Sequence, residues 1–211
     1  MLQKDSELKT VLIKLDDFQK KQDKNKMEFE KNLFQKGLTF SNIYKNNDIV
    51  ISDNGKIVDI GTNKVGYCMC EKVIPKIGQI SFEFEILRIS QWCEVGIGFR
   101  GMVTQNEYQG DSQGKGSYLL NQSSGTYFHH TNNTLGKAFK FQVNEIIIME
   151  VSVEHKYIKW TKQNSQDMLI TQIDTSQNFY LFVNMNNSKV RIKDIYIIMN
   201  FQLSVLYIII L

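Results

Sequence analysis

Few side chains in this sequence could do nucleophilic or metal chemistry. They are three cysteines and three histidines: Cys68, Cys70, Cys93, His129, His130 and His155. Cys68 and Cys70 share one face of a predicted strand, but a lone Cys-x-Cys without a second Cys/His pair at metal-ligand spacing is weak evidence for zinc. His129 and His130 are neighbours on a predicted strand, so we expect them to point to opposite faces and not to share a site. We therefore expect no metal, no cofactor and no catalytic residue.

Two further patterns resemble chemical motifs and lack the context that such motifs need. Gly-x-Gly occurs at residues 96–98 and 114–116, without the strand-turn-helix setting or the Lys-Ser/Thr of a phosphate-binding loop. Glu83 and Glu85 share a strand face, but they alternate with Phe82 and Phe84, so that face is expected to meet solvent. No group of residues meets the geometric requirements of an active site, and the sequence predicts a protein that is not an enzyme.

The composition of the chain indicates its domain size, its class of partner and its cellular location. The chain has 211 residues, of which 42% are hydrophobic, enough for one sandwich domain with an extension. A net charge of +3 without a dominant basic block does not indicate nucleic-acid binding. Three cysteines cannot form a disulfide framework, and the first ten residues lack the apolar core of a secretory signal. We expect a cytoplasmic protein.

Residues 1–37 are predicted to form a charged helix. Residues 1–36 hold nine lysines and seven acidic residues, and they contain no Gly or Pro. Apolar residues recur at the alternating three- and four-residue steps of a coiled-coil seam: Leu8, Val11, Leu15 and Phe18. Gln22 and Asn25 continue this register, so the seam is apolar for only about two heptads, fewer than a stable coiled coil needs. Three interpretations stay open: a helix docked on its own domain, the end of a longer helix, and a weak homodimer through a short coiled coil.

From residue 38 to residue 199 the sequence reads as short β-strands and turns. Asp53-Asn-Gly55 separates two apolar runs, which is a strong hairpin signal because Asn and Gly tolerate positive φ. Residues 78–89 alternate apolar and polar side chains with a period of two. Further runs of this kind follow at 93–100, 116–121, 126–130, 145–154, 156–161, 168–173, 179–185 and 189–198. Many short strands with no helix between them predict an all-β antiparallel sandwich.

The last residues form an apolar tail, which we delimit as 200–211. From Ile195 to Leu211 apolar sequence is interrupted only by Asn200, Gln202 and Ser204. This length approaches that of the shortest membrane-spanning helices, but the polar interruptions and the absence of flanking basic residues favour a terminal strand that runs into a tail.

The succession of these segments resembles the SPRY (B30.2-like) domain. The segments that carry the resemblance are Phe82-Glu-Phe-Glu85, Val95-Gly-Ile-Gly-Phe99, Gly114-Lys-Gly-Ser-Tyr118, Gly125-Thr-Tyr-Phe-His129, the run from Phe141 to Ile148, Tyr157-Ile-Lys-Trp160, and the closing strands at 179–185 and 189–192. The resemblance covers about residues 40–198. It implies a SPRY-like β-sandwich of the concanavalin or lectin-like jelly-roll type. RING and B-box zinc patterns are absent from the sequence, so ubiquitin ligase activity does not follow.

The resemblance also implies an adaptor-like function, namely binding of a short peptide or protein loop by the loops at one end of the sandwich. We expect Tyr108, Asp111 and Tyr118 to contact the ligand, and Asn186 and Asn187 to hydrogen-bond its backbone. Trp92 is a further candidate. The alternative is a carbohydrate-binding sandwich that uses His129, Asn132 and Asn133 near Tyr127. We expect a protein or peptide partner, with neither nucleic acid nor a membrane as a partner.

Overall fold

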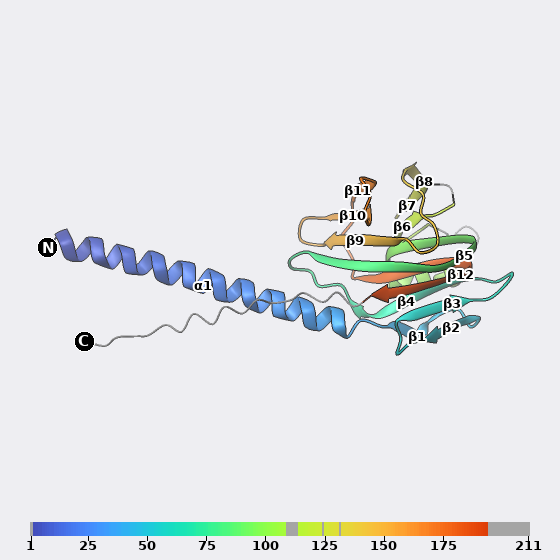
Figure 1. Ribbon diagram of the computed structural model, residues 1–211, viewed down its shortest axis with the longest axis horizontal. Helices are drawn as coiled ribbons and strands as arrows, with labels where there is room; N and C mark the ends of the chain where they lie inside the picture. Colours follow the sequence, from blue (N-terminus) through green and yellow to red (C-terminus); the bar gives the residue numbers. More distant parts are fainter. Residues whose placement is uncertain (1, 109–113, 124, 131, 194–211) are drawn as a thin grey trace.

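The computed structural model describes residues 2–108, 114–123, 125–130 and 132–193 (Figure 1). The elements follow one another in this order: α1 (Leu2–Lys36), β1 (Phe40–Lys45), β2 (Ile49–Ser52), β3 (Ile57–Ile60), β4 (Val65–Val73), β5 (Ile80–Phe99), α2 (Arg100–Thr104), the 3₁₀ turn η1 (Gln105–Tyr108), β6 (Ser117–Asn121), β7 (Thr126–His129), β8 (Asn132–Lys137), β9 (Ile146–Ser152), β10 (Tyr157–Lys162), β11 (Met168–Gln172) and β12 (Phe179–Lys193). None of the helices in these ranges is both long and apolar enough to cross a membrane.

Two long strands, β5 and β12, pair antiparallel with each other and run through both layers of a sandwich. The second half of β5 pairs with β6, which continues to β7 and β8, and the first half of β12 pairs with β4, which continues to β1. We call this layer sheet 1. The first half of β5 pairs with β9, followed by β10 and β11, and the second half of β12 pairs with β3, which continues to β2. We call this layer sheet 2.

The all-β sandwich predicted from the sequence is confirmed, with corrections to its elements. The short helix α2 and the turn η1 lie between β5 and β6, where no helix was expected, and β8 was not predicted. The runs at 78–89 and 93–100 are one strand, β5, and the run at 179–185 continues into the next one as β12. The pairing of β12 with β5 changes register between Asn186 and Ser188 and again between Lys189 and Val190. These bulges bend the strand from one sheet into the other and interrupt the alternation that marks a strand in the sequence.

The core between the sheets follows the predicted alternation. Phe82, Phe84 and Ile86 are buried, whereas Glu83 and Glu85 are partly exposed on the other face. Glu85 accepts a hydrogen bond from Arg191 of β12 at 2.9 Å, so the outward face of β5 in sheet 2 is charged and paired. Ile97, Val151 and Trp160 are buried in this core as well, whereas Phe182, which the sequence also suggested as a core residue, is buried on the outer face of sheet 1.

Gly96 and Gly98 lie where β5 meets other parts of the chain closely, as their alternation in the sequence indicates. A Cβ atom on Gly96 would lie 1.9 Å from the carbonyl oxygen of Tyr118 in β6, so no side chain fits there. A Cβ atom on Gly98 would lie 2.9 Å from Val103. The turn at residues 53–55 is also as predicted, with positive φ at all three residues between β2 and β3.

The helix α1 projects away from the strands and contacts the sandwich near its C-terminal end (Figure 1). There the ring of Phe34 meets the ring of Phe82 edge-on at 6.4 Å, and Lys72 lies 5.7 Å above Phe34. Val11, Leu15 and Phe18 of the predicted seam are 60%, 62% and 55% exposed. At about 100° per helical residue, Phe18 lies about 160° around the helix from Phe34. The seam therefore faces away from the side of α1 that touches the domain.

Candidate functional site

The outer face of sheet 1, opposite the core, carries a second group of buried side chains. Alternation sends Cys93, Val95 and Ile97 into the core, so Glu94 lies on this outer face. It stands beside a smaller apolar cluster on the same face: Tyr67, Met69, Val103, Tyr108, Leu119 and Phe182. Val103 and Tyr108 come from α2 and η1, which fold back over the sheet directly after β5.

Arg100 fastens this covering segment to the sheet. Its guanidinium carbon lies 3.7 Å from the ring centre of Tyr44 and 3.5 Å from that of Tyr180, so it is stacked between two tyrosines. Its Nη2 also donates to the carbonyl oxygens of Cys70 and Glu71 at 2.7 and 2.9 Å. A planar guanidinium suits both contacts, which explains why an arginine begins α2.

Glu94 is a fully buried carboxyl group on the outer face of sheet 1. It accepts hydrogen bonds from the amide groups of Asn121 at 2.6 Å and Asn184 at 2.9 Å, so three adjacent strands meet at one acid. Burial raises the pKa of Glu94 to about 7, although both amide bonds act in the opposite direction. The sequence analysis did not single out Glu94. The available signal was a lone acid inside the apolar run from Cys93 to Phe99.

Tyr108, predicted to contact a ligand, is 2% exposed in this structure. Its hydroxyl group shares a hydrogen bond with Ser117 and accepts another from the backbone N–H of Gly114 at 2.8 Å. Its ring packs edge-on against Phe182 at 4.9 Å. Tyr108 is therefore a core residue of the outer face, which corrects the expectation that it offers contact area. Asp111 lies outside the described residues.

Tyr118 is also buried, and it lies on the opposite side of sheet 1 from Tyr108. Its hydroxyl oxygen accepts a hydrogen bond from the backbone N–H of Asp174 at 2.7 Å. The rings of His129 and His130 lie 4.9 and 6.3 Å from its own. The expectation that Tyr118 is a surface anchor is therefore corrected. The expected separation of the two histidines was wrong too, because His130 follows the end of β7 and no longer alternates with His129.

Asn186 and Asn187 lie where β5 and β12 bend from sheet 1 into sheet 2. We call this place the crease and define it by Gln91, Trp92, Gln122, Asn186 and Asn187. Asn186 pairs with Trp92 across the two strands, and its Nδ2 donates to Gln91 Oε1 at 2.6 Å. On the other side of β5, the backbone N–H of Gln122 donates to the carbonyl of Cys93 at 3.0 Å. Asn187 has a positive φ of 45°, and its N–H points to the carbonyl oxygen of Lys64 at 3.4 Å.

Two acceptors in the crease lack partners. Asn186 Oδ1 and Gln122 Oε1 are buried and make no hydrogen bond with the described part of the chain. Trp92 pairs with Asn186 across β5 and β12 and is partly exposed. Of the predicted site residues, the crease brings together Asn186, Asn187 and the further candidate Trp92. It includes neither tyrosine.

The residues considered for chemistry lie in settings that do not activate them. Burial raises the pKa of the Cys68 thiol to about 12 and raises those of Cys70 and Cys93, so all three stay protonated. Burial also lowers the pKa of His129. No group of three or more His, Cys, Asp or Glu side chains that could hold a metal ion occurs within residues 2–193 where the structure describes them.

The fold is similar to that of several proteins of known structure. The chain is similar to the SPRY domain of human HERC1, with a TM-score of 0.60 and 18% identity over 75% of this chain and 99% of that one. It is similar to the PSpry domain of TRIM65, with a TM-score of 0.59 and 12% identity over 79% and 98% of the two chains. It also resembles stonustoxin, with a TM-score of 0.56 and 13% identity over 74% of this chain and 27% of that one.

At the level of sequence, no family model and no curated protein matches the chain. The structural matches show that it has the fold of SPRY domains, and they confirm the resemblance inferred from the sequence at that level.

Proposed function

We propose that this domain is a non-catalytic protein-interaction module that binds a short peptide or protein loop in the crease. The observation that carries the proposal is the pair of unpaired buried acceptors, Asn186 Oδ1 and Gln122 Oε1. A buried polar atom without a partner costs about 1–3 kcal/mol, and a ligand that donates a hydrogen bond recovers that energy.

An extended peptide fits this chemistry. Its backbone N–H groups are regularly spaced donors, and the crease offers two amide oxygens without partners as acceptors. The indole supplies a large, stiff apolar contact area beside them. Asn187, held with positive φ at the bulge of β12, adds a side chain with both a donor and an acceptor.

The proposal also covers the cellular location of the protein and its association with a second copy. A cytoplasmic location is supported by the three cysteines, all of which are free and buried. A weak homodimer through α1 is supported by the exposed seam at Val11, Leu15 and Phe18. An adaptor function would combine these parts, with the crease for a ligand and the helix for association.

The test starts from the full chain screened against a displayed peptide library and, in parallel, against a glycan array. We expect an enriched peptide sequence and no glycan binding. For the enriched peptide, Asn186→Ala should weaken binding by about 1–3 kcal/mol, roughly five- to 150-fold in Kd. Asn47→Ala changes an exposed asparagine beyond the crease and serves as the matched control. Binding to glycans alone, or equal effects of the two substitutions, would refute the proposal.

A further inference from the structure

Glu94 lies on the same face of sheet 1 as two residues of the crease. Trp92 and Glu94 are two residues apart on β5, and they pair with Asn186 and Asn184, which are two residues apart on β12. The register does not shift between these two pairs, so alternation places all four side chains on the outer face. Two residues of a β-strand span about 7 Å. The buried carboxyl group of Glu94 is therefore the next group along this face from Trp92 and Asn186.

This part of the outer face offers hydrogen-bond acceptors and an aromatic ring. Asn186 Oδ1 is buried and makes no hydrogen bond with the described part of the chain. Glu94 accepts from two neutral amides, and none of the ion pairs within the described ranges includes it. The indole of Trp92 is partly exposed. A ligand group that complements this set carries a positive charge, donates hydrogen bonds and stacks on an aromatic ring.

A guanidinium group has all three properties, and Arg100 shows them within the same protein. Its guanidinium is stacked between the rings of Tyr44 and Tyr180, while its Nη2 donates to two backbone carbonyl oxygens. The flat face meets the rings and the edge donates, a combination that a lysine ammonium does not provide. The crease offers the same two kinds of partner, the ring of Trp92 and the Oδ1 atom of Asn186.

We propose that the ligand of the crease presents an arginine side chain, which stacks on Trp92, donates to Asn186 Oδ1 and is attracted by the carboxylate of Glu94. This assignment rests on the proposed function of the crease and adds the chemical class of the ligand. The attraction acts through the protein interior, where charges are screened less than in water, so direct contact with Glu94 is not required.

The attraction links binding to protons. Burial raises the pKa of Glu94 to about 7, so the acid is protonated in mildly acidic solution and ionised in mildly alkaline solution. A nearby cation favours the ionised form. The arginine ligand should therefore bind more tightly as the pH rises through 7.

The other titratable groups packed around Glu94 do not change charge in this range. Burial raises the pKa values of Cys93, Tyr67 and Tyr108 above their ordinary values, so all three stay neutral up to pH 8.5. His129 and His130 lie beside Tyr118 on the core side of sheet 1, and the comparison with Glu94→Gln separates their contribution.

The cations beside the crease are paired with acids. Lys64, whose carbonyl oxygen is the acceptor for Asn187 N–H, lies 3.2 Å from Asp48. On the side of sheet 2, Arg88 and Lys189 both pair with Asp59.

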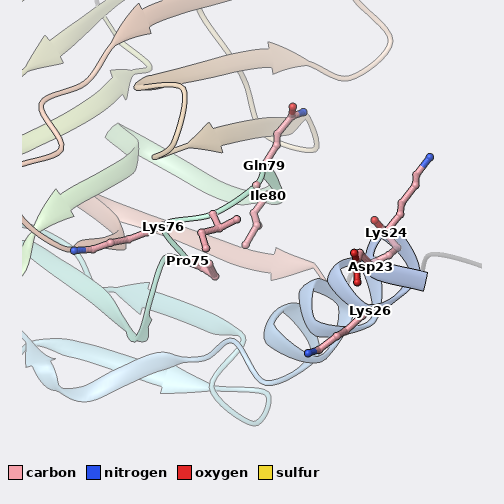
Figure 2. Close-up of a pocket in the computed structure, with 10 residues that line it drawn as sticks. Asp23, Lys24, Lys26, Pro75, Lys76, Gln79 and Ile80 are labelled. Atoms are coloured by element: carbon pink, nitrogen blue, oxygen red, sulfur yellow. The ribbon is translucent and has the colours of Figure 1, made fainter. Parts of the chain in front are cut away.

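A cavity of about 660 Å³ between α1 and the loop that joins β4 to β5 is a competing place for a ligand (Figure 2). Its charged lining residues are two acids and three lysines: Asp23, Glu28, Lys24, Lys26 and Lys76. This excess of lysines does not complement an arginine. A ligand bound there would be weakened by Glu28→Gln and unaffected by Glu94→Gln.

The displayed peptide library, screened against the full chain at pH 8.5, tests the ligand class. We expect the enriched peptides to share an arginine at a fixed position. Enriched peptides without a shared arginine would overturn this assignment and leave the crease as a peptide site. Enrichment of no peptide at all would overturn both the assignment and the proposed function.

The role of Glu94 is tested with a synthetic copy of an enriched peptide that has capped ends and no histidine. Titrated against the full chain, it should bind at least about tenfold more tightly at pH 8.5 than at pH 5.5, the order of magnitude for charges about 7 Å apart inside a protein. A peptide with citrulline in place of the arginine keeps the shape and loses the charge, so its binding should not depend on pH.

Two matched variants complete the test. Glu94→Gln should remove the pH dependence. Glu83→Gln makes the same change on the same strand, at an acid 3.7 Å from Lys193, and should keep it. Circular dichroism at both pH values checks that each variant is folded. Binding of the arginine peptide that does not depend on pH, equal pH dependence in the two variants, or a loss confined to Glu28→Gln would overturn the assignment.

Discussion

Glu94 of β5 and Asn184 of β12 face each other across two adjacent strands, with Asn184 Nδ2 2.9 Å from Glu94 Oε2. Asn121 of β6 donates to the other carboxyl oxygen at 2.6 Å. The group is enclosed on the outer face of sheet 1, so its charge state is set by burial and by these two neutral amides. An acid buried among neutral donors couples the stability of the sheet to pH.

The first prediction concerns that coupling. Because folding raises the pKa of Glu94 from 4.5 to about 7, the folded state holds this proton more tightly than the unfolded state. The contribution of Glu94 to stability is therefore greatest below pH 4.5 and is lost as the pH rises through 7, by about 3 kcal/mol in all. Urea unfolding of the full chain and of Glu94→Gln between pH 5 and pH 8 measures the difference. The comparison cancels other groups such as His129, and identical pH profiles would contradict the prediction.

The second prediction concerns the core of sheet 2. Phe84 is fully buried and pairs with Ile147 of β9 and Ile192 of β12. Phe84→Ala should lower the free energy of unfolding by about 3–5 kcal/mol, the usual cost of removing a buried aromatic ring. Denaturant unfolding measures it, with Ile43→Ala as the control because Ile43 is 76% exposed. Comparable losses in the two variants would show that Phe84 is not part of a packed core.

The third prediction concerns Tyr118. Tyr118→Phe removes the hydroxyl group that accepts from Asp174 and keeps the ring, so it should cost about 1–3 kcal/mol of stability. Peptide binding in the crease should not change, because Tyr118 lies on the core side of sheet 1. Thermal unfolding and titration with the selected peptide measure the two effects. A loss of binding without a loss of stability would restore Tyr118 as a ligand contact.

The fourth prediction concerns association through α1. We expect the full chain to form at most a weak dimer, because only about two heptads of the seam are apolar. The double substitution Leu15→Glu and Phe18→Glu should abolish that dimer and leave the melting temperature unchanged, since both residues are exposed and far around the helix from Phe34. Sedimentation measures the state of association. Ile13→Glu, on the same helix and outside the seam, is the control, and a tight dimer that survives the double substitution would refute the assignment.

The parts of the fold predicted correctly are those in which one face of a strand is buried. From Ile80 to Ile86 apolar and polar residues alternate because one face meets the core and the other meets solvent. The turn at Asp53-Asn-Gly55 was likewise recognisable, because its backbone conformation restricts the residue types that fit.

The parts that were missed lie where both faces of sheet 1 are buried. All five residues of β6 are buried, so alternation could not show which side of the strand Tyr118 faces. Tyr108 belongs to a segment that folds back over the sheet, and nothing local to its sequence indicates that contact. The hydrogen bonds of Glu94 and the residues of the crease depend on pairing between strands about 90 residues apart in sequence. Local sequence patterns do not indicate such pairing.

The contact of Phe34 with Phe82 has a consequence for how this domain can be joined to other molecules. The helix α1 meets the sandwich at Phe82, and β12 reaches its last described residue, Lys193, opposite the neighbouring Glu83. The C-terminal end of α1 and the last described residue of β12 therefore lie at the same pole of the sandwich. Asn186 of the crease lies seven residues back along β12, about 23 Å away at the rise of a β-strand. A label, a surface linker or a fused protein attached through α1 would leave the crease open to solvent.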